Sequence, residues 1–105
     1  MIRVKPGSPV SRKDLAVALD EAKIGNRMLF GGNLVRQPVF ANARKTSSLP
    51  MRIIGNLAGA DTIMNDALFV GVYPGLTSSM CEYIAKSVRD LFALRVESRG
   101  VAGAP

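Results

Sequence analysis

A short cluster of glycine, amide and guanidinium groups carries the chemistry that stands out first in this sequence: Gly31, Gly32 and Asn33, followed by Arg36 and Gln37. Successive backbone N–H groups in a glycine turn can form a cradle for an anion. Arginine holds phosphate or carboxylate through paired hydrogen bonds, and amides supply both donors and acceptors. The spacing is not a dinucleotide fingerprint, and no Walker lysine follows it. From the residues alone, a tight turn followed by a solvated loop is the simpler interpretation.

Two further places have side chains or backbone groups suited to chemistry. Residues 73–77 are expected to close a strand and open a helix, so their N–H groups could receive an anion. Simple helix capping explains the same residues and is the better interpretation. Cys81 is the single thiol. We expect it to be a small buried hydrophobe near the apolar face of a helix, because no base is available to make it a nucleophile.

The composition excludes several classes of protein. The chain has 105 residues, of which 48% are hydrophobic and 21% charged, which suits one globular domain. Because it contains no histidine, serine–histidine and cysteine–histidine catalysis and histidine metal sites are excluded. One cysteine excludes an internal disulfide and a cysteine-only metal site. No apolar run reaches the ~18 residues of a membrane helix, and no secretory signal is recognisable, so we expect a cytoplasmic protein without membrane contact.

The net charge of +6 favours anionic partners such as nucleic acid, phosphorylated metabolites or an acidic protein face. The 14 lysines and arginines form no block of five or six like charges, so a solvated surface is the simpler interpretation. Only six aromatic residues are present, and none is grouped with others as a stacking platform. This argues against a nucleic-acid site.

Two helices are expected from capping signals and apolar spacing. Ser11 and Asp14 resemble a capping box before a helix over residues 12–23, which Gly25 would end. Ser79 and Glu82 form a second such pair, before a helix over residues 79–94.

Alternating or continuous apolar residues predict short strands at 2–5, 27–30 and 68–73. Residues 41–50 are expected to form a loop, and Asp61 to cap a short helix. The order predicts an α+β fold: a small two-layer domain with a short, mostly antiparallel sheet and two main helices on one face. We expect this domain to span residues 1–97, with residues 98–105 as a frayed tail.

The segment FGGNLVRQPVF, at residues 30–40, resembles the DegT/DnrJ/EryC1/StrS family of sugar-nucleotide enzymes that use pyridoxal or pyridoxamine phosphate. Residues 11–33, 61–65 and 71–77 resemble the same family, in the same order. The most similar branch is that of the CDP-4-keto-6-deoxyglucose 3-dehydrases, which includes enzymes of lipopolysaccharide O-antigen synthesis. The resemblance runs from Ile2 to Phe92 and concerns the small C-terminal domain of these fold type I proteins.

The resemblance implies that the large cofactor domain lies outside this chain, so the chain alone would bind no cofactor and would not be catalytic. It places Gly32, Asn33, Arg36 and Gln37 near the sugar nucleotide or the cofactor phosphate, often at a dimer interface. Thr62 departs from the family pattern, which has arginine there. The face that would meet the cofactor domain would be left exposed and apolar, so we expect self-association or a homodimer.

Two alternatives stay open. The chain is also compatible with a stand-alone basic module that binds nucleic acid, which its charge and element order permit. The second alternative is a non-catalytic regulatory or interaction remnant of the family. Dehydration and amino transfer are not distinguished, and neither is the identity of the nucleotide sugar.

Overall fold

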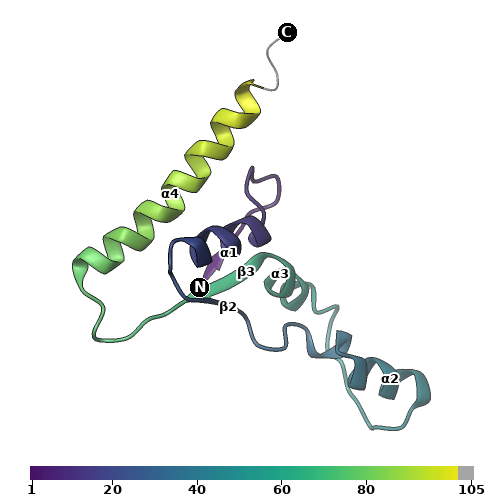
Figure 1. Cartoon of the computed structure of the whole chain (residues 1–105). Helices are drawn as coiled ribbons and strands as arrows, with labels where there is room; N and C mark the ends of the chain where they lie inside the picture. The colour runs from purple at the N-terminus through teal and green to yellow at the C-terminus, as the bar shows by residue number, and fades with distance from the viewer. Residues whose placement is uncertain (102–105) are drawn as a thin grey trace.

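The structure is a computed structural model and describes residues 1–101. Three short strands form one sheet, and the helices lie between and after them in the chain (Figure 1). In chain order the elements are β1 (Ile2–Arg3), α1 (Arg12–Glu21), β2 (Asn26–Met28), the 3-10 turn η1 (Leu34–Arg36), α2 (Pro38–Thr46), α3 (Ala58–Asp66), β3 (Ala67–Val70) and α4 (Ser78–Val101).

The sheet has the order β1-β3-β2, and both pairs are antiparallel. β3 is the central strand, with Leu68 opposite Ile2 on one side and Met28 on the other. All three strands are shorter than their apolar patterns predicted, and β3 ends at Val70 instead of continuing to residue 73. The expected α+β class, with a small antiparallel sheet, is confirmed.

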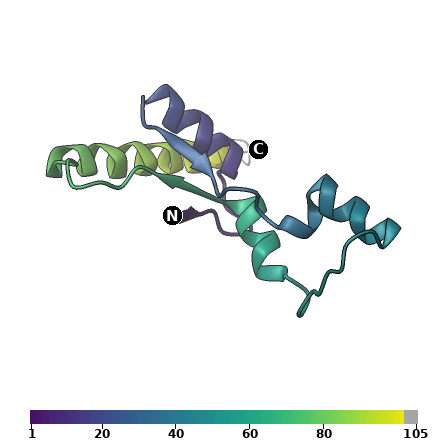
Figure 2. The ribbon, with the colours of Figure 1, turned by 90° about the horizontal axis from the view of Figure 1, so that it is seen from below.

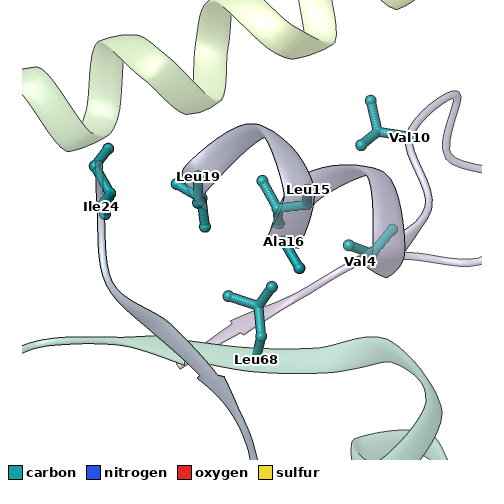
Figure 3. Close-up of a cluster of buried hydrophobic side chains, with 7 residues drawn as sticks. All are labelled: Val4, Val10, Leu15, Ala16, Leu19, Ile24 and Leu68. Carbon is teal, nitrogen blue, oxygen red and sulfur yellow. The ribbon is translucent and has the colours of Figure 1, made fainter. Parts of the chain in front are cut away.

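The hydrophobic core lies between this sheet and the two longer helices (Figure 3). Leu15 and Leu19 of α1 and Leu68 of β3 are completely or almost completely buried. α4 packs along α1, and its Ile84 and Val88 contact the edge of the same cluster. Burial of this apolar surface is the main force that holds α1, α4 and the sheet together.

The start of α1 follows the predicted capping box. The Ser11 hydroxyl accepts from the Asp14 N–H at 3.1 Å, and the Asp14 carboxylate accepts from the Ser11 N–H at 3.1 Å. The predicted end at Gly25 is wrong. Lys23 adopts a left-handed conformation with φ 61°, and the Ile24 N–H donates to the Leu19 carbonyl at 2.8 Å. This Schellman-type ending turns Ile24 back into the core.

The prediction of a loop at residues 41–50 is wrong, because α2 occupies most of that stretch. Pro38 stands at the start of α2, where its missing N–H costs nothing, and Ala, Arg and Lys then favour the helix. Asp61 does not cap α3 either: Leu57 occupies the N-cap, and Asp61 lies within the first turn.

α4 is longer than predicted and runs through the start of the expected frayed tail to Val101. Residues 102–105 lie outside the described part of the chain. The prediction that Cys81 is buried is wrong, since its side chain is exposed. The first turns of α4 extend past the end of the sheet, so burial on this helix begins near Ile84 (Figure 1).

The described chain is not compact throughout. Its radius of gyration is 18.2 Å, whereas about 13 Å is usual for a compact domain of this length. α2 and the segment after it project away from the sheet in both views of the ribbon (Figure 2). Within residues 1–101, none of the helices combines the length and the apolar character needed to cross a membrane.

Candidate functional site

The loop at residues 31–37 leaves the end of β2 and lies directly on α3. Gly32 has φ +65°, and a Cβ built on it would lie 2.5 Å from Cγ of Met64. A side chain there would have to displace Met64, and the positive φ is strained for any residue other than glycine. The sequence interpretation of a tight turn at Gly31 and Gly32 agrees with this geometry.

Asn33 is the residue that fixes the loop from within. It is only 3% exposed, and its Nδ2 donates to Oδ1 of Asp61 at 2.9 Å. Its Oδ1 accepts from the Val35 N–H at 3.3 Å and so caps η1. Both ends of the amide are therefore used, as a buried polar side chain requires.

Arg36 binds the same carboxylate from the other end of the loop. Its Nε donates to Oδ1 of Asp61 at 2.5 Å, and its Nη2 donates to Oδ2 at 2.6 Å. We call Asn33, Arg36 and Asp61 the Asp61 cluster. The hydrogen bonds from Arg36, and then the one from Asn33, lower the pKa of Asp61 to about 2. The same contact with Asp61 raises the pKa of Arg36.

Gln37 closes the loop on itself, because its Nε2 donates to the Gly31 carbonyl at 2.6 Å. The structure therefore brings all four sequence-predicted residues into one small loop. Asn33 and Arg36 meet at Asp61, Gly32 meets α3, and Gln37 joins the two ends. These contacts with α3 and within the loop hold the loop in one conformation. It is therefore pre-formed and needs little ordering to receive a ligand.

One part of the Asp61 cluster faces outward. The Arg36 side chain is 58% exposed, and its contacts with Asp61 use Nε and Nη2. Nη1 has no part in those contacts and is available to donate to an anion. Since one guanidinium can serve two acceptors at once, the arrangement can both orient Arg36 and bind a ligand oxygen.

The loop is also tied to the hydrophobic core. The Arg12 guanidinium of α1 donates to the carbonyl of Met64 in α3, and the Asn33 N–H contacts the Met64 sulfur at 3.5 Å. α3 leads without a break into the central strand β3. The position of the loop is therefore set by the same elements that bury the core.

Sequence reasoning missed the role of Asp61. It lies 25 residues beyond Arg36, and no local pattern links the two positions. The family resemblance included the segment at residues 61–65, while the residues themselves suggested only a helix cap at Asp61. Thr62, where the family pattern has arginine, donates to the Ala58 carbonyl at 3.0 Å within α3.

The second predicted place, at residues 73–77, behaves as a helix cap. The Thr77 hydroxyl accepts from the Met80 N–H at 3.3 Å. Beside it lies an open hollow of about 400 Å³ between the end of α1 and the start of α4, with mostly apolar lining that includes Ile24, Leu76 and Met80. Among residues 1–101 no three histidine, cysteine or carboxylate side chains gather as a metal site would require.

Comparison with known proteins gives a consistent result. The sequence profile of the DegT/DnrJ/EryC1/StrS aminotransferase family matches residues 1–89. Over 93 residues the chain is 44% identical to the lipopolysaccharide biosynthesis protein RfbH of Salmonella typhimurium, a match covering 89% of this chain and 20% of RfbH. Over 92 residues it is 34% identical to dTDP-4-dehydro-2,6-dideoxy-D-glucose 3-dehydratase of Saccharopolyspora spinosa, covering 88% of this chain and 19% of that protein.

The chain thus spans about a fifth of the length of these relatives. The matched region includes the loop at residues 31–37, α3 and the first half of α4. The profile match covers well over half of the chain, and the chain therefore belongs to the DegT/DnrJ/EryC1/StrS aminotransferase family.

Proposed function

We propose that this chain is the small C-terminal domain of a sugar-nucleotide 3-dehydratase or aminotransferase, where it supplies substrate and interface contacts. The observation that carries the proposal is the pre-formed loop at residues 31–37, in which Asp61 orients Arg36 while leaving part of its guanidinium exposed. The names of the two relatives support a substrate that is a nucleotide-linked deoxysugar and a place in deoxysugar or lipopolysaccharide synthesis.

In this role Arg36 would donate to an anionic oxygen of the substrate, and the backbone of Gly32 would allow close approach. Asn33 would hold the loop against α3, and Gln37 would hold its shape. The contribution to the reaction is binding and orientation, since fixed geometry removes part of the entropic barrier. The reaction itself would be elimination or amino transfer on a 4-keto-6-deoxy sugar.

The residues present do not fit a complete site for pyridoxal or pyridoxamine phosphate. The sequence has no histidine, and all five lysines are exposed. A lysine amine that forms a Schiff base is usually activated by a buried or cationic setting. We therefore propose that the cofactor is held by residues outside this chain, and that the chain alone is inactive. When bound in the whole enzyme, the cofactor supplies an electron sink.

Self-association is proposed at a different face, around the start of α4. Val72, Tyr73, Met80 and Tyr83 are exposed apolar or aromatic side chains there, next to the open hollow. Exposed apolar surface of this kind is typical of interaction sites.

The proposed substrate contact is tested by NMR titration of the whole chain with CDP-glucose and dTDP-glucose, two stable nucleotide sugars. We expect amide shifts confined to residues 31–37 and α3, and their loss in Arg36→Gln. Arg52→Gln, at an exposed arginine outside the loop, is the matched control and should bind as the original chain does. Shifts elsewhere only, or equal binding by Arg36→Gln, would contradict the proposal.

A further inference from the structure

The excess positive charge of this chain is confined to one part of its length. Residues 22–60 contain six lysines and arginines and no aspartate or glutamate. The remainder of the chain has equal numbers of positive and negative side chains, eight of each. The whole net charge of +6 therefore belongs to the segment that includes β2, the loop at residues 31–37 and α2.

The outer half of this segment, residues 38–57, is what we call the basic arm. It comprises α2 and the irregular stretch between α2 and α3, and it projects from the body of the fold in both ribbon views (Figures 1 and 2). Within residues 1–101, α2 packs closely only on η1, which directly precedes it. The described hydrogen bonds made by side chains of the arm stay within residues 42–58.

The arm exposes apolar side chains next to its charges. Val39 is 63% exposed and Ile54 73% exposed, and Leu49 and Ile53 are also exposed. Arg44, Lys45 and Arg52 are exposed on the same arm. A helix as short as the nine residues of α2 is marginal in water without tertiary cover. Exposed apolar side chains on a short, poorly covered helix are typical of a segment that packs against another surface.

We propose that the basic arm docks on an acidic protein face, one that places carboxylates around apolar side chains. The cations of the arm would pair with those carboxylates. Val39, Ile53 and Ile54 would pack against the apolar side chains of the partner face. Complementary charge of this kind steers association and selects the partner. The inference concerns the arm, which begins directly after the loop at residues 31–37, and does not depend on the proposed substrate.

Two other occupants fit the arm less well. Two copies of the arm facing each other would bring like charges together, which disfavours that contact. A nucleic acid would use the cations but not the exposed aliphatic side chains, and Phe40 is the single aromatic residue of the arm. Charge and apolar exposure together favour a polypeptide surface.

The test is an NMR titration of the whole ¹⁵N-labelled chain with a synthetic amphipathic helix that carries leucines on one face and glutamates on the flanks. We expect amide shifts in the arm that weaken with added salt. Arg44→Gln/Lys45→Gln should bind about tenfold more weakly, and Arg44→Glu/Lys45→Glu more weakly still. Arg89→Glu/Arg99→Glu, which reverses two exposed charges on α4, is the control and should bind unchanged.

Several results would overturn the proposal. One is the absence of shifts in the arm, and another is equal binding of a peptide with lysines in place of the glutamates. Tighter binding of a single-stranded RNA oligonucleotide would make the arm a nucleic-acid site. Arm shifts that appear on concentrating the chain alone would make a second copy the occupant. Core amide signals, from Leu15 and Leu68 for example, report whether each variant is folded.

Discussion

Asp61 and Arg36 form a two-point ion pair that connects the first turn of α3 to the loop after β2. Nε of Arg36 lies 2.5 Å from Oδ1 and Nη2 lies 2.6 Å from Oδ2. Asn33 donates to the same carboxylate from a buried position. One carboxylate thus fixes both the buried and the exposed end of the loop. These hydrogen bonds give the glycine-rich loop one defined conformation.

The Asp61 cluster should loosen in acid. The hydrogen bonds from Arg36 and Asn33 lower the pKa of Asp61 from 3.8 to about 2, so the folded state favours the carboxylate. This contribution is fully present well above pH 3.8 and is lost as the pH falls toward 2. Amide hydrogen exchange at residues 32–37, corrected for the intrinsic exchange rate, should therefore become faster over that pH range, because the loop opens more often.

Asp61→Asn removes the titrating group and is the control for this effect. In that variant the loop should already be more open at neutral pH, and the acid-dependent change at residues 32–37 should disappear. Asp14, whose pKa is also lowered by hydrogen bonds from Ser11, should still respond at the start of α1. An acid response in the loop that is identical in Asp61→Asn would show that another group causes it.

Gly32→Ala should destabilise the fold by about 1–3 kcal/mol. The added Cβ would lie 2.5 Å from Cγ of Met64, and φ +65° is strained for alanine. Urea unfolding followed by circular dichroism measures the loss. Gly59→Ala is the matched control, because Gly59 lies in α3 with open space around it. It should stabilise by about 0.5–1 kcal/mol. Equal effects of the two substitutions would contradict the described contact of Gly32 with α3.

Leu15→Ala should cost about 2–5 kcal/mol of unfolding free energy, because it leaves a cavity between α1 and the sheet. Leu15 is completely buried, whereas Val17 on the same helix is 47% exposed. Val17→Ala should therefore change the unfolding free energy by less than about 0.5 kcal/mol. The same denaturation experiment compares them, and a small loss for Leu15→Ala would place the core elsewhere.

Sequence patterns predicted the body of the fold because its signals are local. The Ser11–Asp14 pair marks the start of α1, and apolar residues at helical spacing mark α4. α2 was missed because most of its residues are small or polar and show no apolar periodicity. Such a helix is recognised by the propensities of its residues and by Pro38 at its start, which are weaker signals.

The sequence predicted the loop residues of the candidate site but not the carboxylate that holds them. Asn33, Arg36 and Gln37 cluster in the sequence, so their types suggested a binding loop. Asp61 joins them only through the packing of α3 against that loop, which no spacing in the sequence encodes. Cys81 was placed wrongly for a related reason. Helical spacing identifies an apolar face, but it does not show how far α4 extends past the sheet.

The most direct test of the account is the affinity of Asp61→Asn for the nucleotide sugar that binds the original chain, measured by NMR titration beside thermal unfolding. An exposed ion pair contributes little to global stability, so the melting temperature should be nearly unchanged. We predict clearly weaker binding, because Arg36 loses its fixed orientation. Unchanged affinity with an unchanged melting temperature would contradict the claim that Asp61 shapes the binding loop.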